Sequence, residues 1–303
     1  MTAEQTFRIA SIPADGVGAE VVAAGRAVLA ALETAPAGRF SFAWTEFPWG
    51  SDYYAEHGVM MPGDGLELLR EFDAIYFGAV GRPTVPDHMS LWGLRLKICQ
   101  GFDQWANVRP VTFLPGITSP LRTAGETELD WIVVRENSAG EYAGFGGRNF
   151  TARAAGGEVA VQSAVFTESM LVDAMSAKFV LQPQDLSVVV ASNLSADILS
   201  DLGSALAGSL GLAVSANLNP ERRYPSMFEP VHGSAPDIAG QGRCNPIGSA
   251  ALMLEHFGLP DEATSIRTAI ETTTAQGIRT PDVGGTADTA AVRTSARSSR
   301  IDP

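Results

Sequence analysis

The apolar and polar residues of this chain fall into blocks that predict strands followed by helices. Phe7–Pro13 is an apolar run typical of a buried strand, the turn Ala14-Asp15-Gly16 follows it, and helical spacing extends from Gly18 to about Glu33. The same spacing rules predict helices at 66–72, 91–104, 196–207, 248–256 and 261–276, and strands at 74–80, 131–134, 159–166 and 186–191. Strands that alternate with helices are typical of an α/β fold with a largely buried sheet. The Ser- and Arg-rich tail after Arg293 is predicted to be frayed.

Composition and charge narrow the functional classes. The chain has 303 residues, 45% of them hydrophobic and 18% charged, as in ordinary globular proteins with one large or two moderate domains. A formal net charge of −13 argues against a nucleic-acid partner, because phosphate backbones are bound by clustered Lys and Arg. Solubility alone explains most of this charge. A small anionic substrate remains compatible with it, because one or two arginines in a cleft can outweigh the global charge locally.

The number of cysteines and the hydropathy of the chain indicate in which cellular compartment the protein is expected. The two cysteines, Cys99 and Cys244, do not make a disulfide framework and therefore favour a reducing environment. The N-terminal sequence MTAEQTF lacks the basic and apolar regions of a secretory signal. The weakly polar stretch 202–218 is too short and too rich in Ser, Gly and Ala to span a bilayer. We therefore expect a cytoplasmic protein with no membrane partner.

The segment Asn193-Leu-Ser-Ala-Asp197-Ile-Leu-Ser-Asp201 is the strongest local signal for chemistry. Its two aspartates stand four residues apart, so both lie on one face of the expected helix, directly after a predicted strand. Carboxylates in this arrangement suit a hard divalent cation such as Mg²⁺ or Mn²⁺, which prefers oxygen ligands. The alternative is a solvated acidic helix start in which Asp197 interacts with the helix dipole.

The long loop from Phe228 to Pro246 is the second candidate site. It contains glycines that allow close backbone approach, the histidine His232 and an acid, Asp237, able to accept hydrogen bonds from ribose hydroxyls. The alternative is a well-ordered surface loop. The chain has no GxGxxG motif, and the turn Gly16-Val17-Gly18 is too generic to indicate a dinucleotide site.

Several long motifs carry a family resemblance. The runs IPADGVGAEV, VVRENSAGEYAG, ASNLSADILSDLG and FEPVHGSAPDIAG resemble the isocitrate and isopropylmalate dehydrogenase family in order and spacing. The stretches DHMSLWGLRL, QGFDQWANVRPV and SANLNPERRYPSMFEPVHGSAPDI are most similar to its tartrate dehydrogenase/decarboxylase and D-malate dehydrogenase branch. The resemblance covers about residues 7–287.

The resemblance implies an isopropylmalate-dehydrogenase-like two-domain α/β fold with a discontinuous larger domain. We expect residues 1–104 and 208–303 to form the larger, NAD-binding domain. Residues 105–207 should form the smaller domain for substrate, metal and dimerisation. In that family the substrate, a small 2-hydroxy acid, lies between the domains of a homodimer.

The same resemblance implies site residues, one matched position at a time. Asp197 and Asp201 match two metal-binding aspartates, and Asp173 matches the third, which the family contributes across the dimer. Tyr142 matches the tyrosine that acts as a general acid. Arg109 and Arg135 match two of three arginines that bind substrate carboxylates, a task suited to a planar bidentate donor.

The cofactor loop is also carried over from the resemblance. Its matched positions are His232, Gly233, Ser234, Ala235, Asp237 and Asn245. An acid at Asp237 repels a 2′-phosphate and can bind free ribose hydroxyls, so we expect NAD rather than NADP, together with Mg²⁺ or Mn²⁺. Taken singly, such residues have plainer interpretations: Asp173 as an exposed helix residue, Tyr142 as a packed aromatic, Arg109 as the partner of a nearby acid. Their matched order along one chain favours functional ancestry.

The sequence departs from the family in one long gap. Near Met170 and Leu171 the family has some fifty more residues, including a strand of the smaller domain and a K-x-N motif whose lysine helps deprotonate the substrate hydroxyl of the neighbouring subunit. The chain's two lysines, Lys97 and Lys178, lie outside any such motif. The smaller domain is therefore expected to be truncated and the dimer weakened. Lys178 stands five residues after Asp173, a helical rotation of about 140° away from it, so it should face elsewhere.

A second departure affects the arginines. The position ten residues before Arg109, where the family has its first substrate arginine, is Cys99. Arg95 lies one helical turn earlier on the same face and is a candidate replacement in substrate binding. Cys99 itself also fits a small buried apolar side chain.

Two functional hypotheses follow. The first is an NAD- and divalent-metal-dependent oxidoreductase that oxidatively decarboxylates a malate-, tartrate- or isopropylmalate-like 2-hydroxy acid, impaired by loss of the catalytic lysine. The second is a degenerate, non-catalytic paralogue that binds a ligand or a partner subunit. The intact aspartates and cofactor loop favour the first, and the missing lysine favours the second.

Overall fold

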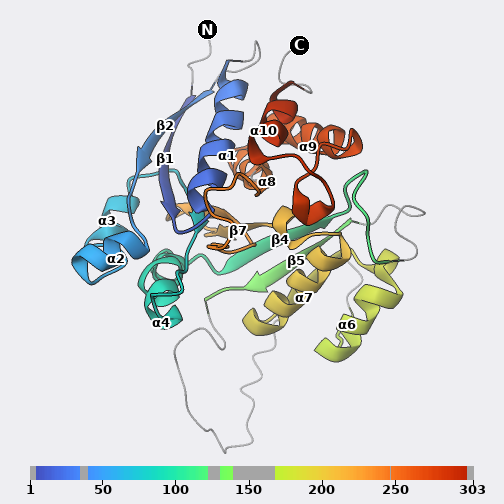
Figure 1. The fold of residues 1–303 in the computed structure, drawn as a ribbon. Coiled ribbons are helices and arrows are strands. Elements are labelled where there is room, and N and C mark those ends of the chain that lie inside the picture. Colours follow the sequence, from blue (N-terminus) through green and yellow to red (C-terminus); the bar gives the residue numbers. More distant parts are fainter. Residues whose placement is uncertain (1–4, 35–39, 122–129, 139–167, 246, 299–303) are drawn as a thin grey trace, which may run out of the picture.

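The computed structural model describes residues 5–34, 40–121, 130–138, 168–245 and 247–298. Its described strands form one eight-stranded sheet in the order β2-β1-β3-β8-β7-β4-β5-β6 (Figure 1). The strands are β1 (Gln5–Ala14), β2 (Phe40–Glu46), β3 (Ala74–Ala79), β4 (Ala106–Thr112), β5 (Asp130–Glu136), β6 (Val188–Ala191), β7 (Val214–Leu218) and β8 (Ser226–Pro230). β2, β1, β3 and β8 are parallel, β7 is antiparallel to β8 and β4, and β5 is antiparallel to β4 and parallel to β6.

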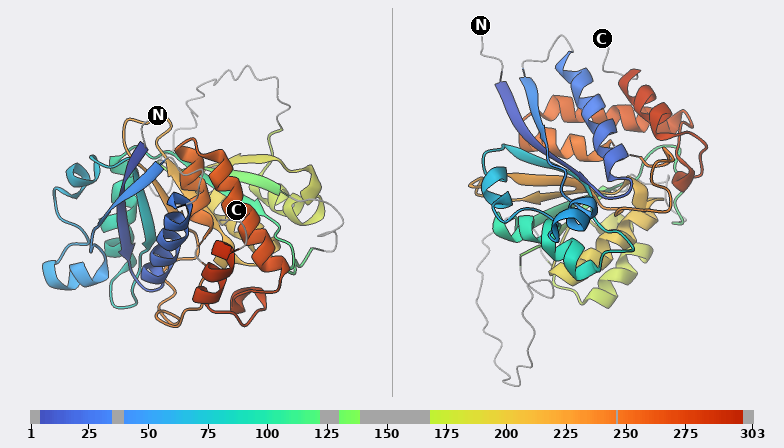
Figure 2. Two further views of the ribbon diagram at one scale, coloured as in Figure 1. Left: turned by 90° about the horizontal axis from the view of Figure 1, so that it is seen from above. Right: turned by 60° about the vertical axis from the view of Figure 1, so that its left-hand side comes forward.

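The helices gather in groups around this sheet (Figures 1 and 2). They are α1 (Gly18–Glu33), α2 (Ser51–His57), α3 (Gly65–Leu69), α4 (Asp87–Ser90), the π-helical turn η1 (Leu91–Arg95), α5 (Leu96–Gly101), α6 (Val172–Leu181), α7 (Asn193–Leu206), α8 (Gly248–His256), α9 (Pro260–Ala275) and α10 (Thr289–Ser298). Short 3₁₀ turns lie at Pro183–Asp185, Leu210–Leu212 and Pro281–Val283. The α/β prediction is confirmed. None of the described helices is long and apolar enough to cross a membrane.

The parallel strands are buried on both faces. Ile9 and Tyr76 pack with α1, α8, α9 and α10 on one side, whereas Ile12 and Phe77 pack on the other side with residues of the α2–α5 region. This arrangement explains the nearly continuous apolar sequences of β1 and β3, because a strand covered on both faces needs apolar residues at successive positions.

The strands β4, β5 and β6 belong to a separate apolar cluster. Trp131, Val133 and Val189 pack with Phe179 of α6 and Leu199 of α7, and every member of this cluster lies between residues 111 and 207. The opposite face of β5 and β6 is open, with Ile132 36%, Val188 60% and Val190 74% exposed. The separate cluster agrees with the predicted division into residues 1–104 with 208–303 and residues 105–207, and that division stays a prediction.

Some local predictions were incomplete or wrong. The sequence reading did not anticipate β2, β4, β7 or β8, and it began α7 three residues late. The predicted frayed tail is wrong for residues 293–298, because Val292 and Ala296 of α10 are buried in the main core. The predicted strand at 159–166 lies outside the described residues.

Pro110 lies within β4, although a proline cannot donate a hydrogen bond to a neighbouring strand. The pairing of β4 with β7 ends at Val108, so the missing N–H of the proline removes no bond on that side. On the other side Pro110 faces Ile132 of β5. The N–H of Ile132 donates to the carbonyl oxygen of Ser187, just before β6, and is therefore directed away from Pro110. A proline is therefore compatible with this strand.

Candidate active site

A cavity of about 260 Å³ opens at the carboxyl ends of β3 and β8. Such crevices are where ligands bind in open α/β sheets. Its charged lining consists of three arginines and three acids, contributed by five different elements: Arg95, Arg109, Arg135, Asp197, Asp201 and Glu229. Gly233 of the predicted cofactor loop also lines it. The structure therefore brings two of the three predicted metal-binding aspartates, the three predicted arginines and one residue of the predicted cofactor loop to one cavity.

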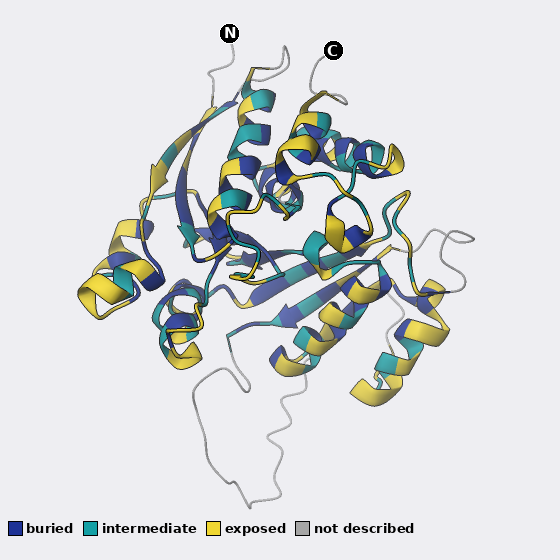
Figure 3. Cartoon of the chain, in the orientation of Figure 1, coloured by how far each residue is buried: buried dark blue, intermediate teal, exposed yellow. Residues whose placement is uncertain are grey.

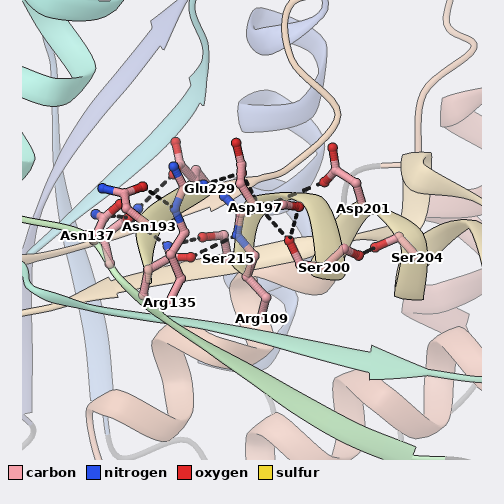
Figure 4. Close-up of polar contacts among 12 residues, drawn as sticks. Arg109, Arg135, Asn137, Asn193, Asp197, Ser200, Asp201, Ser204, Ser215 and Glu229 are labelled. Carbon is pink, nitrogen blue, oxygen red and sulfur yellow. Dashed lines mark hydrogen bonds and ion pairs between the residues drawn. The ribbon is translucent and has the colours of Figure 1, made fainter. Parts of the chain in front are cut away.

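Asp197 is the centre of this charge cluster (Figure 4). Its Oδ1 accepts a hydrogen bond from Arg109 Nη1 at 2.9 Å and another from Arg135 Nη1. Asp201 Oδ1 lies 3.8 Å from the same Arg109 nitrogen. The two carboxylates are thus neighbours on one face of α7, as their spacing predicts, and α7 begins directly after β6 at the sheet edge.

Arg109 and Arg135 stand on the adjacent strands β4 and β5 and are both buried. Arg109 Nε donates to Asn107 Oδ1 at 2.8 Å, and Arg135 Nε donates to Asn193 Oδ1 at 2.8 Å. Burial lowers the pKa of Arg109, and the Asp197 carboxylate opposes that shift. Because a guanidinium titrates far above neutral pH, both side chains remain cations held in fixed orientations.

The two aspartates fit a divalent cation. Partial burial, and then the like charge of Asp197, raise the pKa of Asp201 above its usual range. A bound cation would relieve this repulsion, and hard cations prefer carboxylate oxygens. Within the described part of one chain, no third His, Cys, Asp or Glu joins them. Asp173 is exposed on α6, where its Oδ1 accepts from the backbone N–H of Ala174 at 2.8 Å.

Arg95 lines the cavity, but its guanidinium is already ion-paired with Glu229. Its Nε lies 3.0 Å from both carboxylate oxygens of Glu229, and its Nη2 lies 2.5 Å from Oε1. Cys99 is buried in the core beneath the cavity, in agreement with its plainer interpretation. Burial raises the pKa of the Cys99 thiol to about 11, so it is neutral near pH 7.

Sequence reasoning missed two residues of this site, Glu229 and Asn217. Glu229 ends β8 inside the motif FEPVHGSAPDI, and its place in that motif was the available signal. Asn217 is fully buried. Its Oδ1 accepts from Asn107 at 2.7 Å and from Asn137 at 3.0 Å, and its Nδ2 donates to Glu229 at 2.7 Å. This network connects β4, the end of β5, β7 and β8 beneath the arginines.

The predicted cofactor loop is only partly gathered at the cavity. Gly233 has a positive φ of 71°, and a side chain there would meet open space. The His232 Nδ1 lies 2.9 Å from the carbonyl oxygen of Gly233, and its buried Nε2 has no partner among the described residues. Burial lowers the pKa of His232, so the ring is neutral near pH 7. A neutral ring with a free nitrogen suits a hydrogen-bonding ligand such as a dinucleotide.

The remaining predicted cofactor residues lie along the same loop. Ser234 and Ala235 are half-buried against α1, and Asp237 is exposed. Asn245 lines a different, smaller cavity of about 110 Å³ between β4, α8 and α9. The structure therefore places Asn245 apart from the charged cavity that Gly233 lines.

The predicted general acid, Tyr142, lies outside the described residues. Neither lysine lines the cavity, and Lys178 Nζ lies 3.4 Å from Glu168 Oε2. This position agrees with the expectation that Lys178 faces elsewhere.

Known structures share this fold. An isocitrate dehydrogenase from Methylococcus capsulatus superposes with a TM-score of 0.79 at 27% identity, and the match covers 97% of this chain and 99% of that one. A beta-decarboxylating dehydrogenase from Thermococcus kodakarensis superposes with a TM-score of 0.71 at 30% identity, so the fold is that of the isocitrate-dehydrogenase-like decarboxylating dehydrogenases.

The sequence comparisons identify the family. The sequence model of the family described as "Isocitrate/isopropylmalate dehydrogenase" matches residues 8–168 and 147–301, and the chain belongs to this family. A probable tartrate dehydrogenase/decarboxylase from Agrobacterium vitis is 51% identical over 341 aligned positions that cover 93% of each chain. The D-malate dehydrogenase [decarboxylating] of Escherichia coli (strain K12) is 42% identical, covering 94% of this chain and 96% of its own. Since 341 positions exceed the 303 residues here, the Agrobacterium relative carries residues that this chain lacks.

Proposed function

We propose that this chain is an NAD- and divalent-metal-dependent dehydrogenase acting on a small 2-hydroxy acid of the malate or tartrate type, which it oxidatively decarboxylates. One observation carries the proposal: a metal-type aspartate pair and three arginines line a single cavity that the cofactor loop reaches. The printed names of the similar Agrobacterium and Escherichia proteins support the substrate class.

The arginines supply the substrate contacts. Arg109 and Arg135 present buried, oriented guanidinium groups, which bind carboxylates through two parallel hydrogen bonds. Once Asp197 and Asp201 hold a cation, the Arg109 and Arg135 donors are available to a substrate carboxylate. Arg95 adds a third positive charge, already balanced by Glu229. We therefore expect Arg95 to orient a substrate carboxylate more than to attract it.

The cofactors would be held by the residues assigned to them above. Asp197 and Asp201, with Asp173 of a second copy, would hold Mg²⁺ or Mn²⁺, and the loop His232–Asn245 would hold NAD. When bound, the metal supplies polarisation of the substrate hydroxyl and carbonyl oxygens, and NAD supplies the oxidant. Asp237, exposed on that loop, would accept hydrogen bonds from the ribose hydroxyls and disfavour NADP.

Dimer formation belongs to the same proposal. Leu171 and Val172 at the start of α6, and Leu194 and Ile198 of α7, are exposed apolar side chains on two helices that contact each other. Covering them with a second copy would remove apolar surface from water and bring Asp173 to the partner's aspartates. Sedimentation of the purified protein tests this point, since a monomer at micromolar concentration would contradict it.

Proton transfer is the weak step. Tyr142 is assigned the protonation of the decarboxylated product, whereas no lysine is available for the substrate hydroxyl, because neither Lys97 nor Lys178 lines the cavity. General acid–base groups contribute about 10²–10⁴-fold in rate, so turnover should be lower than in a complete family member by roughly that factor. The same observation favours the alternative, a non-catalytic paralogue that binds ligand without turnover.

One experiment separates these possibilities. NADH formation is followed with D-malate, tartrate and isopropylmalate in the presence of Mn²⁺, and binding of each acid is measured by calorimetry. Slow turnover that is lost in Asp197→Asn and retained in Asp185→Asn supports the enzyme, since Asp185 is an exposed acid away from the cavity. Binding without turnover identifies the paralogue. A kcat in the ordinary range of about 1–10³ s⁻¹ refutes the impairment, and neither binding nor turnover refutes the proposal.

A further inference from the structure

The cofactor loop is fastened to two helices that the sequence did not connect with it. Its backbone follows β8 and runs along the first turns of α1, while the start of α10 lies against its far end. A loop with several glycines has many accessible conformations, so something must select the one that binds a ligand. The fastening residues are therefore of interest in their own right.

The loop begins at a close backbone contact. The N–H of Val17 donates to the carbonyl oxygen of Ser234 at 2.8 Å. Gly16 next to it has a φ of 58°, and a Cβ there would lie 1.9 Å from that carbonyl oxygen. Glycine is thus required at position 16 for the loop to approach α1.

Glu20 holds the middle of the loop. It stands in the first turn of α1, where the helix dipole favours a negative charge. Its Oε1 accepts a hydrogen bond from the N–H of Gly240, and its Oε2 accepts one from the N–H of Gly242 at 2.9 Å. Both glycines have positive φ values, 75° and 62°. One carboxylate therefore holds both glycines of this left-handed turn.

Thr289 holds the far end of the loop. Its Oγ1 donates to the carbonyl oxygen of Cys244 at 2.6 Å and accepts from the N–H of Cys244 at 3.1 Å. Its own N–H donates to the carbonyl oxygen of Gly242 at 2.7 Å. Gly242 is thus bonded on one side by Glu20 and on the other by Thr289, so the two helices hold the same short segment.

The opposite side of the loop remains accessible. Gly233 and Asp237 are exposed, whereas Ala235, Ile238 and Ala239 pack on Val17 and Val21 of α1. All the fastening contacts described above come from the helix side. They can therefore fix the shape of the loop without occupying the surface that a ligand would meet.

We propose that Glu20 and Thr289 are positioning residues that hold loop 231–245 in its NAD-binding conformation. The NAD part of this inference rests on the function proposed above. Neither side chain touches the cofactor; each acts through the backbone of residues 240–244. α10, at the C-terminal end of the described chain, is on this view a component of the cofactor site.

Limited trypsin digestion and NAD titration test this in parallel. Arg243 is exposed within the fastened segment, and cleavage after it requires local opening of the loop. Glu20→Ala should speed formation of the 1–243 fragment and weaken NAD binding by about tenfold each, since it removes two hydrogen bonds to a charged group. Thr289→Val should speed the cleavage and weaken NAD binding several-fold, whereas Thr289→Ser, which keeps the hydroxyl, should behave like the wild type in both measurements. Mn²⁺ affinity should change less than twofold.

Matched controls remove the same chemistry elsewhere. Glu33, on the same helix, accepts from the N–H of Phe42 at 2.5 Å, and Thr294, on α10, donates to the carbonyl oxygen of Ala290 at 2.8 Å. Glu33→Ala and Thr294→Val should leave both the Arg243 cleavage rate and NAD affinity unchanged. If Glu20→Ala does not fold by circular dichroism, Thr289→Val carries the test.

The outcomes separate this inference from the proposed function. Wild-type rates of cleavage and wild-type NAD affinity in both Glu20→Ala and Thr289→Val overturn the positioning role. Faster cleavage with unchanged NAD affinity shows that the residues fasten the loop but overturns their role in cofactor binding. A wild-type protein that binds no NAD overturns the proposed cofactor, and the cleavage rates then still decide whether the loop is fastened as described.

Discussion

The two halves of the sheet differ in how completely they are covered. In the closed half, formed by β2, β1, β3, β8 and β7, residues such as Ile9, Ile12 and Tyr76 are fully buried between helical layers. In the open half, formed by β4, β5 and β6, helices cover one face, whereas Val190 on the other face is 74% exposed. In Figure 3, α6, which packs on the covered face of the open half, carries mostly exposed residues.

The half of the sheet that is covered on one face only is also the half in which the chain is shorter than its relatives. The two matches to the family model overlap at 147–168, just ahead of the position where motif spacing places the gap. The described chain resumes at Glu168 and leads directly into α6 of the open half. Exposed apolar residues gathered on one face mark a surface suited to contact with another element or chain. The loss has thus fallen on the half that carries Asp197 and Arg135, and the cofactor loop remains fastened to the closed half.

Placing a charge inside the closed half gives the largest expected effect. Cys99 is 1% exposed and lies near the Arg95–Glu229 pair. Cys99→Arg restores the family's arginine but adds a second guanidinium to one carboxylate. It should lower the free energy of unfolding by about 3–5 kcal/mol, as for an uncompensated buried charge. Urea denaturation measures this.

The double variant Arg95→Leu/Cys99→Arg is the control for that prediction. It leaves one guanidinium facing Glu229 and should recover most of the lost stability, which a double-mutant cycle would report as strong coupling. Full stability of Cys99→Arg alone would show that the closed half tolerates the family's arrangement and that Arg95 is not its replacement.

The second largest effect is expected from a change at Asp197, in the charged cavity that residues of both halves line. Asp197→Asn removes a proposed metal ligand and also weakens the acceptor shared by Arg109 and Arg135. Loss of an outer-shell partner alone lowers metal affinity about 10–100-fold, so loss of a ligand should exceed 100-fold. Calorimetry with Mn²⁺ measures this, and Asp197→Asn binding Mn²⁺ like the wild type would remove the metal from this site.

On the cofactor side a smaller effect is expected. Asp237→Ala removes the carboxylate that would repel a 2′-phosphate, so the preference for NAD over NADP should fall about tenfold. Asp261→Ala, a change at another exposed acid, should leave the preference unaltered. Fluorescence titration with both cofactors measures it. Tighter NADP binding by the unaltered protein would reverse the assignment.

Charge in the open half should matter least. Val190→Lys adds a cation to a face already in water, so the free energy of unfolding should change by no more than about 0.5 kcal/mol. The neighbouring Val189 is 5% exposed, and Val189→Lys should destabilise by several kcal/mol, on the order of other buried charges. Equal losses in the two variants would show that something covers this face and would end the contrast between the halves.

Local pattern predicted the elements whose burial is simple. β1 and α1 have uniform environments, so their periodicity matches the structure. β2 was missed although Phe40, Phe42 and Trp44 alternate, a signal that period-two counting would have found. β7 could not be found in this way. Its Ser215 and Asn217 are polar but buried, because their partners come from β4 and β8, and local sequence resembles a loop.

In the site, too, local sequence predicted the contacts within one element and missed those between distant elements. Spacing alone placed Asp197 and Asp201 together, because both belong to one helix. The pairing of Arg95 with Glu229 joins residues 134 positions apart, and the pairing of Arg109 with Asp197 joins residues 88 positions apart. Such contacts depend on strand order, which the sequence pattern did not specify. Motif matching supplied the arginines and the loop but did not separate Asn245 from Gly233.

The order of strands has a kinetic consequence. β3 pairs with β8, so Ala74 must meet Ser226, about 150 residues later in the chain. During synthesis the first strands therefore wait for the last third of the polypeptide before the centre of the sheet can close, and such non-local pairing makes folding slow. Closure entropy grows only with the logarithm of the intervening length. Shortening that stretch by roughly fifty residues thus eases closure by only about 0.2–0.3 kcal/mol. The missing segment has little influence on how the closed half assembles, which is why that half can remain well packed beside a truncated neighbour.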